Sequence, residues 1–299
     1  MSGVVNAHAH LELSSLSKPL DVPSRKMSDW VGALLKFRHS DSYQPEAAIR
    51  AALQSLRGTI AVADIVPPRL HDISFSTADC FHFSFIELIA WREDQINQLQ
   101  PAIRDARFLS PHAPQTVCPA LLEQVVQAGV PVAMHLAETK DELALLRHHR
   151  GGLLEMMRRA DSDYSPKKVL LGKRPLDYLQ LLSQAPKALV IHGNYLDDEE
   201  LRFLAAHRET MAVVYCPRSH AYFRHKPYPL QKMLDLGVRV LLGTDSLASS
   251  PDLNVVNEMR FAQQQHPNVP LETIIRLGTS ESIEFFGPSD CKFEVGVLR

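Results

Sequence analysis

Short, continuous apolar runs recur along this chain, and most are separated by segments whose apolar residues repeat with a helical period. Runs of this kind predict strands that are buried on both faces, as in a parallel sheet covered by helices. We expect eight strands, at residues 3–7, 59–66, 80–89, 108–110, 130–134, 188–191, 211–215 and 238–242.

Helices are expected between most of these strands. The pattern predicts them at residues 28–38, 45–56, 92–104, 119–127, 141–150, 176–184, 198–207, 230–236, 253–265 and 271–286. The stretch 151–175 is expected to be irregular. The Ser-rich, Pro-containing segment 14–28 is expected to form a long loop after the first strand, where a substrate lid would lie.

Eight alternating units predict a (β/α)8 barrel of the TIM type, formed by one domain over residues 1–299. An open, doubly wound sheet is the main alternative. That fold usually carries a glycine-rich phosphate-binding turn after its first strand, and this sequence has none there.

Composition narrows the class of function. The 299 residues are 45% hydrophobic and carry a formal net charge of −2, from 32 basic and 34 acidic side chains. This balance argues against a nucleic-acid partner. No apolar run reaches the roughly 18 residues of a membrane-spanning helix, and the N-terminus lacks a signal-peptide pattern. Four widely spaced cysteines without a C-x-x-C pair fit a reducing cytoplasm.

Histidines and an aspartate follow several of the predicted strands. His8 and His10 share one face of an extended strand, because side chains at i and i+2 point the same way. His135, His192 and Asp245 come at the ends of later strands, and the carboxyl ends of barrel strands meet at one face. Imidazoles with a carboxylate suit Zn²⁺ or Fe²⁺. The alternatives are polar strand-end residues for the His pair and a buried, backbone-bonded histidine for His192.

Glu138 lies three residues after His135, where it can reach the same pocket without binding the metal. A carboxyl group beside an activated water can carry a proton to a leaving group. The alternative is an acid at a helix N-terminus, stabilised by the helix dipole.

Six short motifs occur in a fixed order: NAHAHLE at 6–12, SPHAP at 110–114, HLAET at 135–139, HGN at 192–194, CPRS at 216–219 and GTDS at 243–246. In these motifs the chain resembles the amidohydrolase superfamily. Within it, the resemblance is to the branch of cytosine, guanine, adenosine-type and aminodeoxyfutalosine deaminases and triazine chlorohydrolases.

The resemblance implies one divalent metal ion held by His8, His10, His135 and Asp245, and we expect Zn²⁺ rather than Fe²⁺. Glu138 would protonate the leaving group, His192 would hydrogen-bond the hydroxide or oxyanion, and Asp245 would also act as base. The implied reaction is hydrolytic deamination. Metal-bound hydroxide adds to a ring carbon of an aminated purine or nucleoside-like heterocycle, of adenosine or aminodeoxyfutalosine type, and ammonia leaves.

Candidate substrate contacts are His112, Arg218, His220, Glu87 and Trp30, with Arg92 a weaker one. Four of them have a structural alternative: a rigid turn for His112, solvated side chains for Arg218 and His220, and helix packing for Trp30. The substrate is expected to be a small molecule.

Two other functions remain open. One is a chlorohydrolase or other amidohydrolase acting on a triazine- or pyrimidine-like ring, and the other is a non-catalytic barrel scaffold. Members of this branch carry a small β-sandwich built from both termini. Because the first predicted strand starts at residue 3, we expect that sandwich to be largely absent here. Barrel surface left uncovered could then form a homodimer contact.

Overall fold

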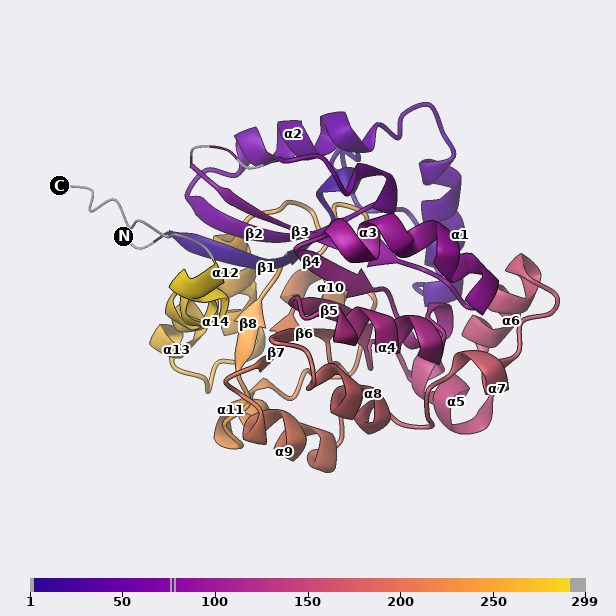
Figure 1. Cartoon of the computed structure of the whole chain (residues 1–299). Coiled ribbons are helices and arrows are strands. Elements are labelled where there is room, and N and C mark those ends of the chain that lie inside the picture. The colour runs from indigo at the N-terminus through magenta and orange to yellow at the C-terminus, as the bar shows by residue number, and fades with distance from the viewer. Residues whose placement is uncertain (1–2, 76, 78, 291–299) are drawn as a thin grey trace.

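Eight parallel strands form the centre of the protein in a computed structural model that describes residues 3–75, 77 and 79–290. Neighbouring strands pair in chain order from β1 to β8, with helices packed around the outside (Figure 1). The strands are β1 (Val4–Ala9), β2 (Thr59–Val66), β3 (Phe81–Leu88), β4 (Phe108–Pro111), β5 (Val132–Leu136), β6 (Ala188–His192), β7 (Met211–Tyr215) and β8 (Val240–Leu242). The predicted (β/α)8 barrel is confirmed.

Closure of the barrel joins β1 to the end of β8. Ala9 and Asp245 form a parallel bridge, and the amides of Thr244 and Asp245 donate to the carbonyl of His8 at 3.0 and 3.1 Å. Gly243 permits this approach, because a Cβ there would lie 2.9 Å from the Cβ of His8. Closure therefore places the first predicted ligand pair beside the last predicted ligand.

An irregularity in β1 turns the histidine pair toward the barrel axis. Asn6 pairs with Val62 and Ala9 with Asp64, so three residues of β1 match two of β2. One extra residue reverses which side chains face inward. Val5 and Ala7 belong to the apolar interior, and beyond the shift His8 points to that same side.

The helices largely follow the predicted ranges. Their bounds are α1 (Met27–Arg38), α2 (Pro45–Ser55), α3 (Gln100–Asp105), α4 (Pro119–Gln127), α5 (Lys140–His148), α6 (Gly152–Ala160), α7 (Pro166–Val169), α8 (Pro175–Leu182), α9 (Asp198–Ala206), α10 (Pro217–Tyr222), α11 (Leu230–Asp235), α12 (Val255–Gln265), α13 (Leu271–Leu277) and α14 (Ser280–Asp290). Short 3₁₀ turns lie at Leu11–Leu13, Pro68–Leu70, Glu93–Leu99 and Pro114–Thr116.

The helices differ from the prediction at four places. The stretch 151–175, predicted to be irregular, contains α6, which buries Leu153, Leu154 and Met157 on one face, and the short α7, while 161–165 and 170–174 are irregular. The predicted helix 271–286 is two helices, α13 and α14, and the carbonyl of Gly278 between them accepts the amide of Val5. The predicted helix 92–104 is a 3₁₀ turn followed by α3, and α10 was not predicted.

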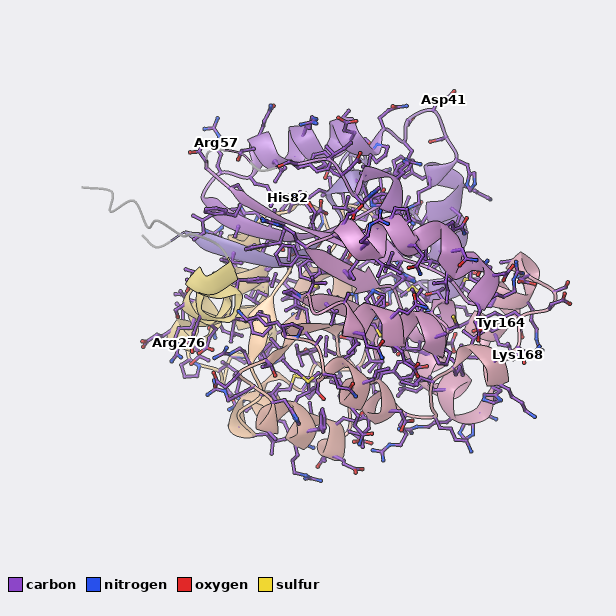
Figure 2. All side chains as sticks on the ribbon, viewed as in Figure 1. Asp41, Arg57, His82, Tyr164, Lys168 and Arg276 are labelled. Atoms are coloured by element: carbon purple, nitrogen blue, oxygen red, sulfur yellow. The ribbon has the colours of Figure 1, made fainter. Side chains whose placement is uncertain are left out.

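The core has two main layers, and side chains fill the space between strands and helices (Figure 2). The larger lies between the sheet and the surrounding helices. The smaller fills the barrel and is closed by α14, where the ring of Phe286 stacks on Phe83 at 4.8 Å between centroids. Among the described residues, no helix is long and apolar enough to cross a bilayer.

Candidate active site

His8, His10 and His135 come together at the carboxyl ends of β1 and β5. One nitrogen from each ring lies within 4.8 Å of the others, and all three residues are buried. Nε2 of His10 is 3.4 Å from Nε2 of His135. Three imidazole nitrogens converging on one point are a suitable donor set for a divalent metal ion.

Asp245 completes this group from the end of β8. Its Oδ1 lies 3.8 Å from Nε2 of His8 and 3.9 Å from Nε2 of His10. The hydroxyls of Ser219 and Ser249 lie 2.6 and 2.9 Å from the other oxygen, Oδ2. Because Oδ2 is held by these two serines, Oδ1 is the oxygen presented to the histidines.

Burial keeps the histidines neutral. It lowers the pKa of His8 and His10 well below the ordinary value, and neighbouring imidazoles lower it further. Burial also lowers the pKa of His135 to about 4. Nδ1 of His135 lies 3.0 Å from the carbonyl of His112, so a proton there leaves Nε2 free as a ligand.

The buried ring nitrogens support a metal site. Both nitrogens of His8 and Nδ1 of His10 are buried without a hydrogen-bond partner in the described residues. Buried polar atoms normally have partners, and those that lack one call for an explanation. A coordinated metal ion explains the orphaned Nε2 of His8, which converges with Nε2 of His10 and Oδ1 of Asp245, so the residues fit the divalent ion that the sequence predicts.

Glu138 lies just beyond β5 and faces His192. Its Oε1 is 3.4 Å from Nε2 of His192. Burial, followed by the charges of Asp245 and Glu142, raises the pKa of Glu138 well above its usual range. The raised pKa favours the protonated carboxyl group, which can deliver its proton inside the site.

The backbone around Glu138 is fixed by two polar side chains. The carboxylate of Glu142 accepts the amides of Ala137 and Glu138 at 2.6 and 3.0 Å. The side-chain amide of Asn194 donates to the carbonyl of Glu138 at 3.0 Å. Glu142, on α5, thus positions the turn that carries the candidate proton donor.

His192 ends β6 with a left-handed backbone, φ 69°. Its carbonyl accepts the Tyr228 hydroxyl at 3.0 Å, which holds this unusual conformation. The ring centroid lies 5.7 Å from that of His8 and 5.6 Å from that of His135. Left-handed non-glycine residues often occur at functional sites, and Asp245, with φ 59°, is a second example here.

A second set of polar groups lines the β3–β4 side of the site. Nε2 of His112 lies 4.0 Å from Oε1 of Glu87, and the ring of His112 is 5.2 Å from that of His135. Arg38, from α1, forms an ion pair with the buried Glu12. Burial lowers the pKa of both His10 and His112, and the charge of Arg38 lowers it further.

Other predicted substrate contacts lie outside the histidine group. The guanidinium of Arg218 is held by Asp252 and Glu258, with nitrogen–oxygen distances of 2.7–2.8 Å. Trp30 donates to the carbonyl of Ala248 at 3.1 Å. A substrate contact by Arg218 or Trp30 therefore stays a prediction. The hydrogen bonds described above give each of these side chains a structural role.

Two further candidates have different surroundings. His220 lies on α10, and its Nε2 is buried without a partner in the described residues. Arg92 is largely exposed and forms ion pairs with Asp94 and Asp161, away from the histidine group.

Several supporting residues escaped the sequence analysis: Glu12, Arg38, Asp64, His82, Glu142, Ser219, Tyr228 and Ser249. Asp64 accepts the amide of Leu11 at 2.8 Å and lies 2.8 Å from Nε2 of His82, which Figure 2 labels. The hydrogen bond from the amide of Leu11 to Asp64 fixes the turn that follows His10. Of these residues, only Glu12 and Ser219 could have been found from the sequence, because they lie inside the motifs NAHAHLE and CPRS.

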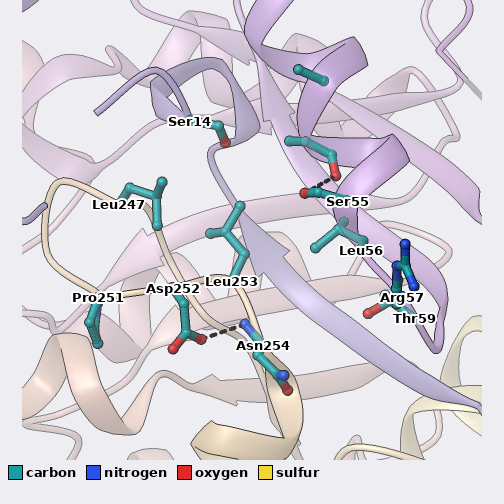
Figure 3. A pocket seen from close by; sticks show the side chains of 12 residues that line it. Ser14, Ser55, Leu56, Arg57, Thr59, Leu247, Pro251, Asp252, Leu253 and Asn254 are labelled. Carbon is teal, nitrogen blue, oxygen red and sulfur yellow. Dashed lines mark hydrogen bonds between the residues drawn. The ribbon is translucent and has the colours of Figure 1, made fainter. Parts of the chain in front are cut away.

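A separate surface groove lies between α2 and the segment that leads into α12 (Figure 3). Its lining includes Ser14, Leu56, Leu253 and Asn254, and none of the converging histidines is among its described lining residues. This groove is distinct from the candidate active site.

Comparison with known families identifies the class of protein. The amidohydrolase family model matches residues 74–294, so the chain belongs to the amidohydrolase family.

Named relatives are deaminases. The chain is 35% identical over 190 residues to a 5-methylthioadenosine/S-adenosylhomocysteine deaminase of Pyrococcus furiosus, covering 60% of this chain and 40% of that protein. It is 28% identical over 302 residues to the aminodeoxyfutalosine deaminase of Deinococcus radiodurans, covering 91% and 69%. The chain thus spans less than half of the first of these relatives and about two thirds of the second.

Solved structures share the fold. Aminofutalosine deaminase of Helicobacter pylori, in complex with methylthio-coformycin, superposes with a TM-score of 0.77 at 20% identity, covering 95% of this chain and 74% of that one. An adenosine deaminase from Xanthomonas campestris with bound zinc gives a TM-score of 0.64 at 21% identity, covering 95% and 66%.

Proposed function

We propose that the protein is a metal-dependent hydrolytic deaminase of an aminated purine nucleoside or a related compound. The observation that carries this proposal is the pairing of a neutral histidine cluster with a protonatable Glu138 in one buried site. The names of the relatives support an adenosine-like substrate.

His8, His10, His135 and Asp245 would hold the metal ion, which we propose to be Zn²⁺. A divalent ion bound there would lower the pKa of a coordinated water toward about 7. Zinc in related structures supports this choice over Fe²⁺, and the nitrogen and oxygen donors suit both ions.

Two carboxyl groups of the protein would carry out the proton transfers. Asp245 has a raised pKa, caused by burial, and can accept a proton from the attacking water. Glu138, 3.4 Å from His192, would protonate the amino group that leaves, and we propose that His192 hydrogen-bonds the attacking oxygen. Glu87 and His112 face the same site and are proposed to bind polar groups of the substrate.

This arrangement favours ammonia over chloride as leaving group. Ammonia leaves after protonation, and Glu138 provides a buried proton donor for that step. Chloride leaves without a proton, so the chlorohydrolase alternative needs no proton donor for its leaving group. A cytoplasmic location remains part of the proposal.

Ammonia release from adenosine, 5-methylthioadenosine, guanine, pterins and pyrimidines tests the function directly. We expect turnover of at least one adenosine-like compound. Glu138→Gln should lower kcat by about 10²–10⁴-fold, the usual contribution of a general acid, with metal content unchanged. Glu123→Gln, an exposed site on α4, is the matched control. Turnover by Glu138→Gln at the wild-type rate would contradict the assigned proton donor.

A further inference from the structure

His192 faces the site against the side-chain alternation of its own strand. Along β6, Ile191 belongs to the barrel interior, whereas Val190 packs in the outer layer between the sheet and the helices. Successive side chains of a strand point to opposite faces, so a regular β6 would direct His192 outward, as it does Val190. The ring of His192 instead lies 5.7 Å from that of His8 and 5.6 Å from that of His135, between centroids.

The register between β5 and β6 shows the same contrast. His135 pairs with Ile191, and both side chains point into the barrel. Leu136 pairs with His192, and Leu136 packs in the outer layer. His135 therefore reaches the site as an ordinary strand residue, whereas His192 needs a change in the backbone to do so.

A left-handed backbone provides that change. His192 has φ 69°, and residues of parallel strands have φ near about −120°. This difference is a rotation of about half a turn around the N–Cα bond, which carries Cβ to the opposite side of the strand. The conformation is uncommon for residues other than glycine and persists where the surrounding structure imposes it.

The Tyr228 hydroxyl binds the backbone of this turn. It donates to the carbonyl of His192 at 3.0 Å, and the amide of Gly193 donates to the carbonyl of Leu136 at 3.1 Å. The turn is thus tied to β5 on one side and to the segment before α11 on the other. Burial raises the pKa of Tyr228 well above its usual range, so the hydroxyl stays protonated and remains a donor.

Tyr228 is itself held in place. Prolines precede and follow it in the sequence, and a residue before proline is restricted to extended conformations. Its ring stacks on Tyr215, the last residue of β7, with 3.8 Å between centroids and 11° between the ring planes. The hydroxyl of Tyr215 lies 3.3 Å from Nε2 of His266, which follows α12. A buried ring fixed in this way presents its hydroxyl in one position.

We propose that Tyr228 is a positioning residue for the reaction, because its hydroxyl keeps the imidazole of His192 turned toward the other histidines of the site. The inference rests on the proposed deaminase function, in which His192 hydrogen-bonds the attacking oxygen. Nε2 of His192 lies 3.4 Å from Oε1 of Glu138, so the same turn also sets the distance between this ring and the proton donor.

Tyr228→Phe tests the proposal, because it removes the hydroxyl and keeps the stacked ring. We expect kcat and kcat/KM for ammonia release to fall together by about tenfold or more, since the interaction lost acts on the reacting oxygen. Metal content, measured by elemental analysis, should stay at the wild-type level.

Tyr164→Phe is the matched control. The hydroxyl of Tyr164, which Figure 2 labels, also donates to a backbone carbonyl, that of Gln115, at 2.9 Å. Tyr164 and Tyr228 are each 4% exposed, so both variants lose a buried hydroxyl from a backbone carbonyl. Tyr164→Phe should keep the wild-type kcat. An equal loss of kcat in both variants would overturn the proposal, and so would wild-type kcat in Tyr228→Phe.

A double-mutant cycle tests whether Tyr228 acts through His192. In the His192→Gln protein, the further change Tyr228→Phe should lower the remaining kcat by less than about twofold, because the group that Tyr228 positions is already gone. The same loss with and without His192 would show that Tyr228 acts by another route and would overturn the proposal.

Nitrogen NMR of the histidine rings tests the same point without turnover. The signal of His192, assigned by its absence in His192→Gln, should shift in Tyr228→Phe and stay in place in Tyr164→Phe. An unshifted signal in Tyr228→Phe would overturn the proposal. A shifted signal, in a protein whose wild-type form releases ammonia from none of the compounds tested, would support the positioning of His192 and contradict the deaminase function.

Discussion

At the scale of single residues, two serines decide which oxygen of Asp245 faces the histidines. Ser219 and Ser249 both lie within hydrogen-bond distance of Oδ2, and both are buried. Groups that orient a metal ligand in this way are often nearly as important for metal binding as the ligand itself.

Ser219→Ala should therefore weaken metal binding by about 10–100-fold, because Asp245 loses one of the two hydroxyls that orient it. Ser250→Ala is the matched control, since Ser250 lies in the same loop as Ser249 but its hydroxyl bonds Glu258. Competition with a chelator of known affinity measures both variants. An unchanged affinity in Ser219→Ala would contradict the positioning role.

The sequence predicted the histidines of the site but not the residues that hold the site in place. His8, His10 and His135 follow apolar runs, so strand ends alone predict that they meet. Ser249 and Arg38 reach the site through loop and helix packing, which leaves no periodic signal in the sequence.

At the scale of elements, strands were predicted better than helices. All eight strands lie where the apolar runs predicted them, because a buried parallel strand requires continuous apolar sequence. The helix α6 was missed because Gly151 and Gly152 stand at its start and charged residues interrupt it, although its buried leucines pack against the larger core. The break between α13 and α14 depends on a backbone contact from Gly278 to β1, which is a tertiary effect.

The N-terminus of α9 offers a local test of element stability. Asp197 accepts the amides of Glu199 and Glu200, both at 3.1 Å, and Glu200 in turn accepts the amide of Asp197 at 2.8 Å. Asp197→Ala should lower the free energy of unfolding by about 1 kcal/mol, the usual cost of a lost helix cap.

Urea unfolding measures this effect, with two controls. Asp197→Asn can still accept the amides and should retain most of the stability. Asp198→Ala removes an exposed ion pair with Lys232 and should cost less than about 0.5 kcal/mol. If Asp197→Ala is as stable as the wild-type protein, this cap does not stabilise α9.

At the scale of the whole molecule, buried histidines couple stability to pH. Burial lowers the pKa of His112, His135, His220 and His225, each to about 4. In the unfolded chain these groups would titrate near pH 6.5. Below that pH the unfolded chain binds protons that the folded protein does not, so the free energy of unfolding falls.

In the metal-free protein, the contribution of these histidines to thermal stability should therefore fall as the pH falls from 7 toward 4, whereas buried carboxyl groups with a raised pKa, such as Glu142 and Glu258, act in the opposite direction. Each unit of pKa difference corresponds to about 1.4 kcal/mol. Calorimetric melting temperatures at several pH values would show the trend. His225→Gln should flatten it, whereas His148→Gln should not, and equal slopes in wild type and His225→Gln would count against this origin.

The central claim is that one divalent ion, held by the histidines and Asp245, supports deamination. The most direct test is to remove metal with a chelator and then measure ammonia release from the best nucleoside as zinc is added back. Activity should be lost on chelation and should rise in proportion to zinc until about one ion is bound per chain. Full activity in protein shown by elemental analysis to be metal-free would contradict the claim.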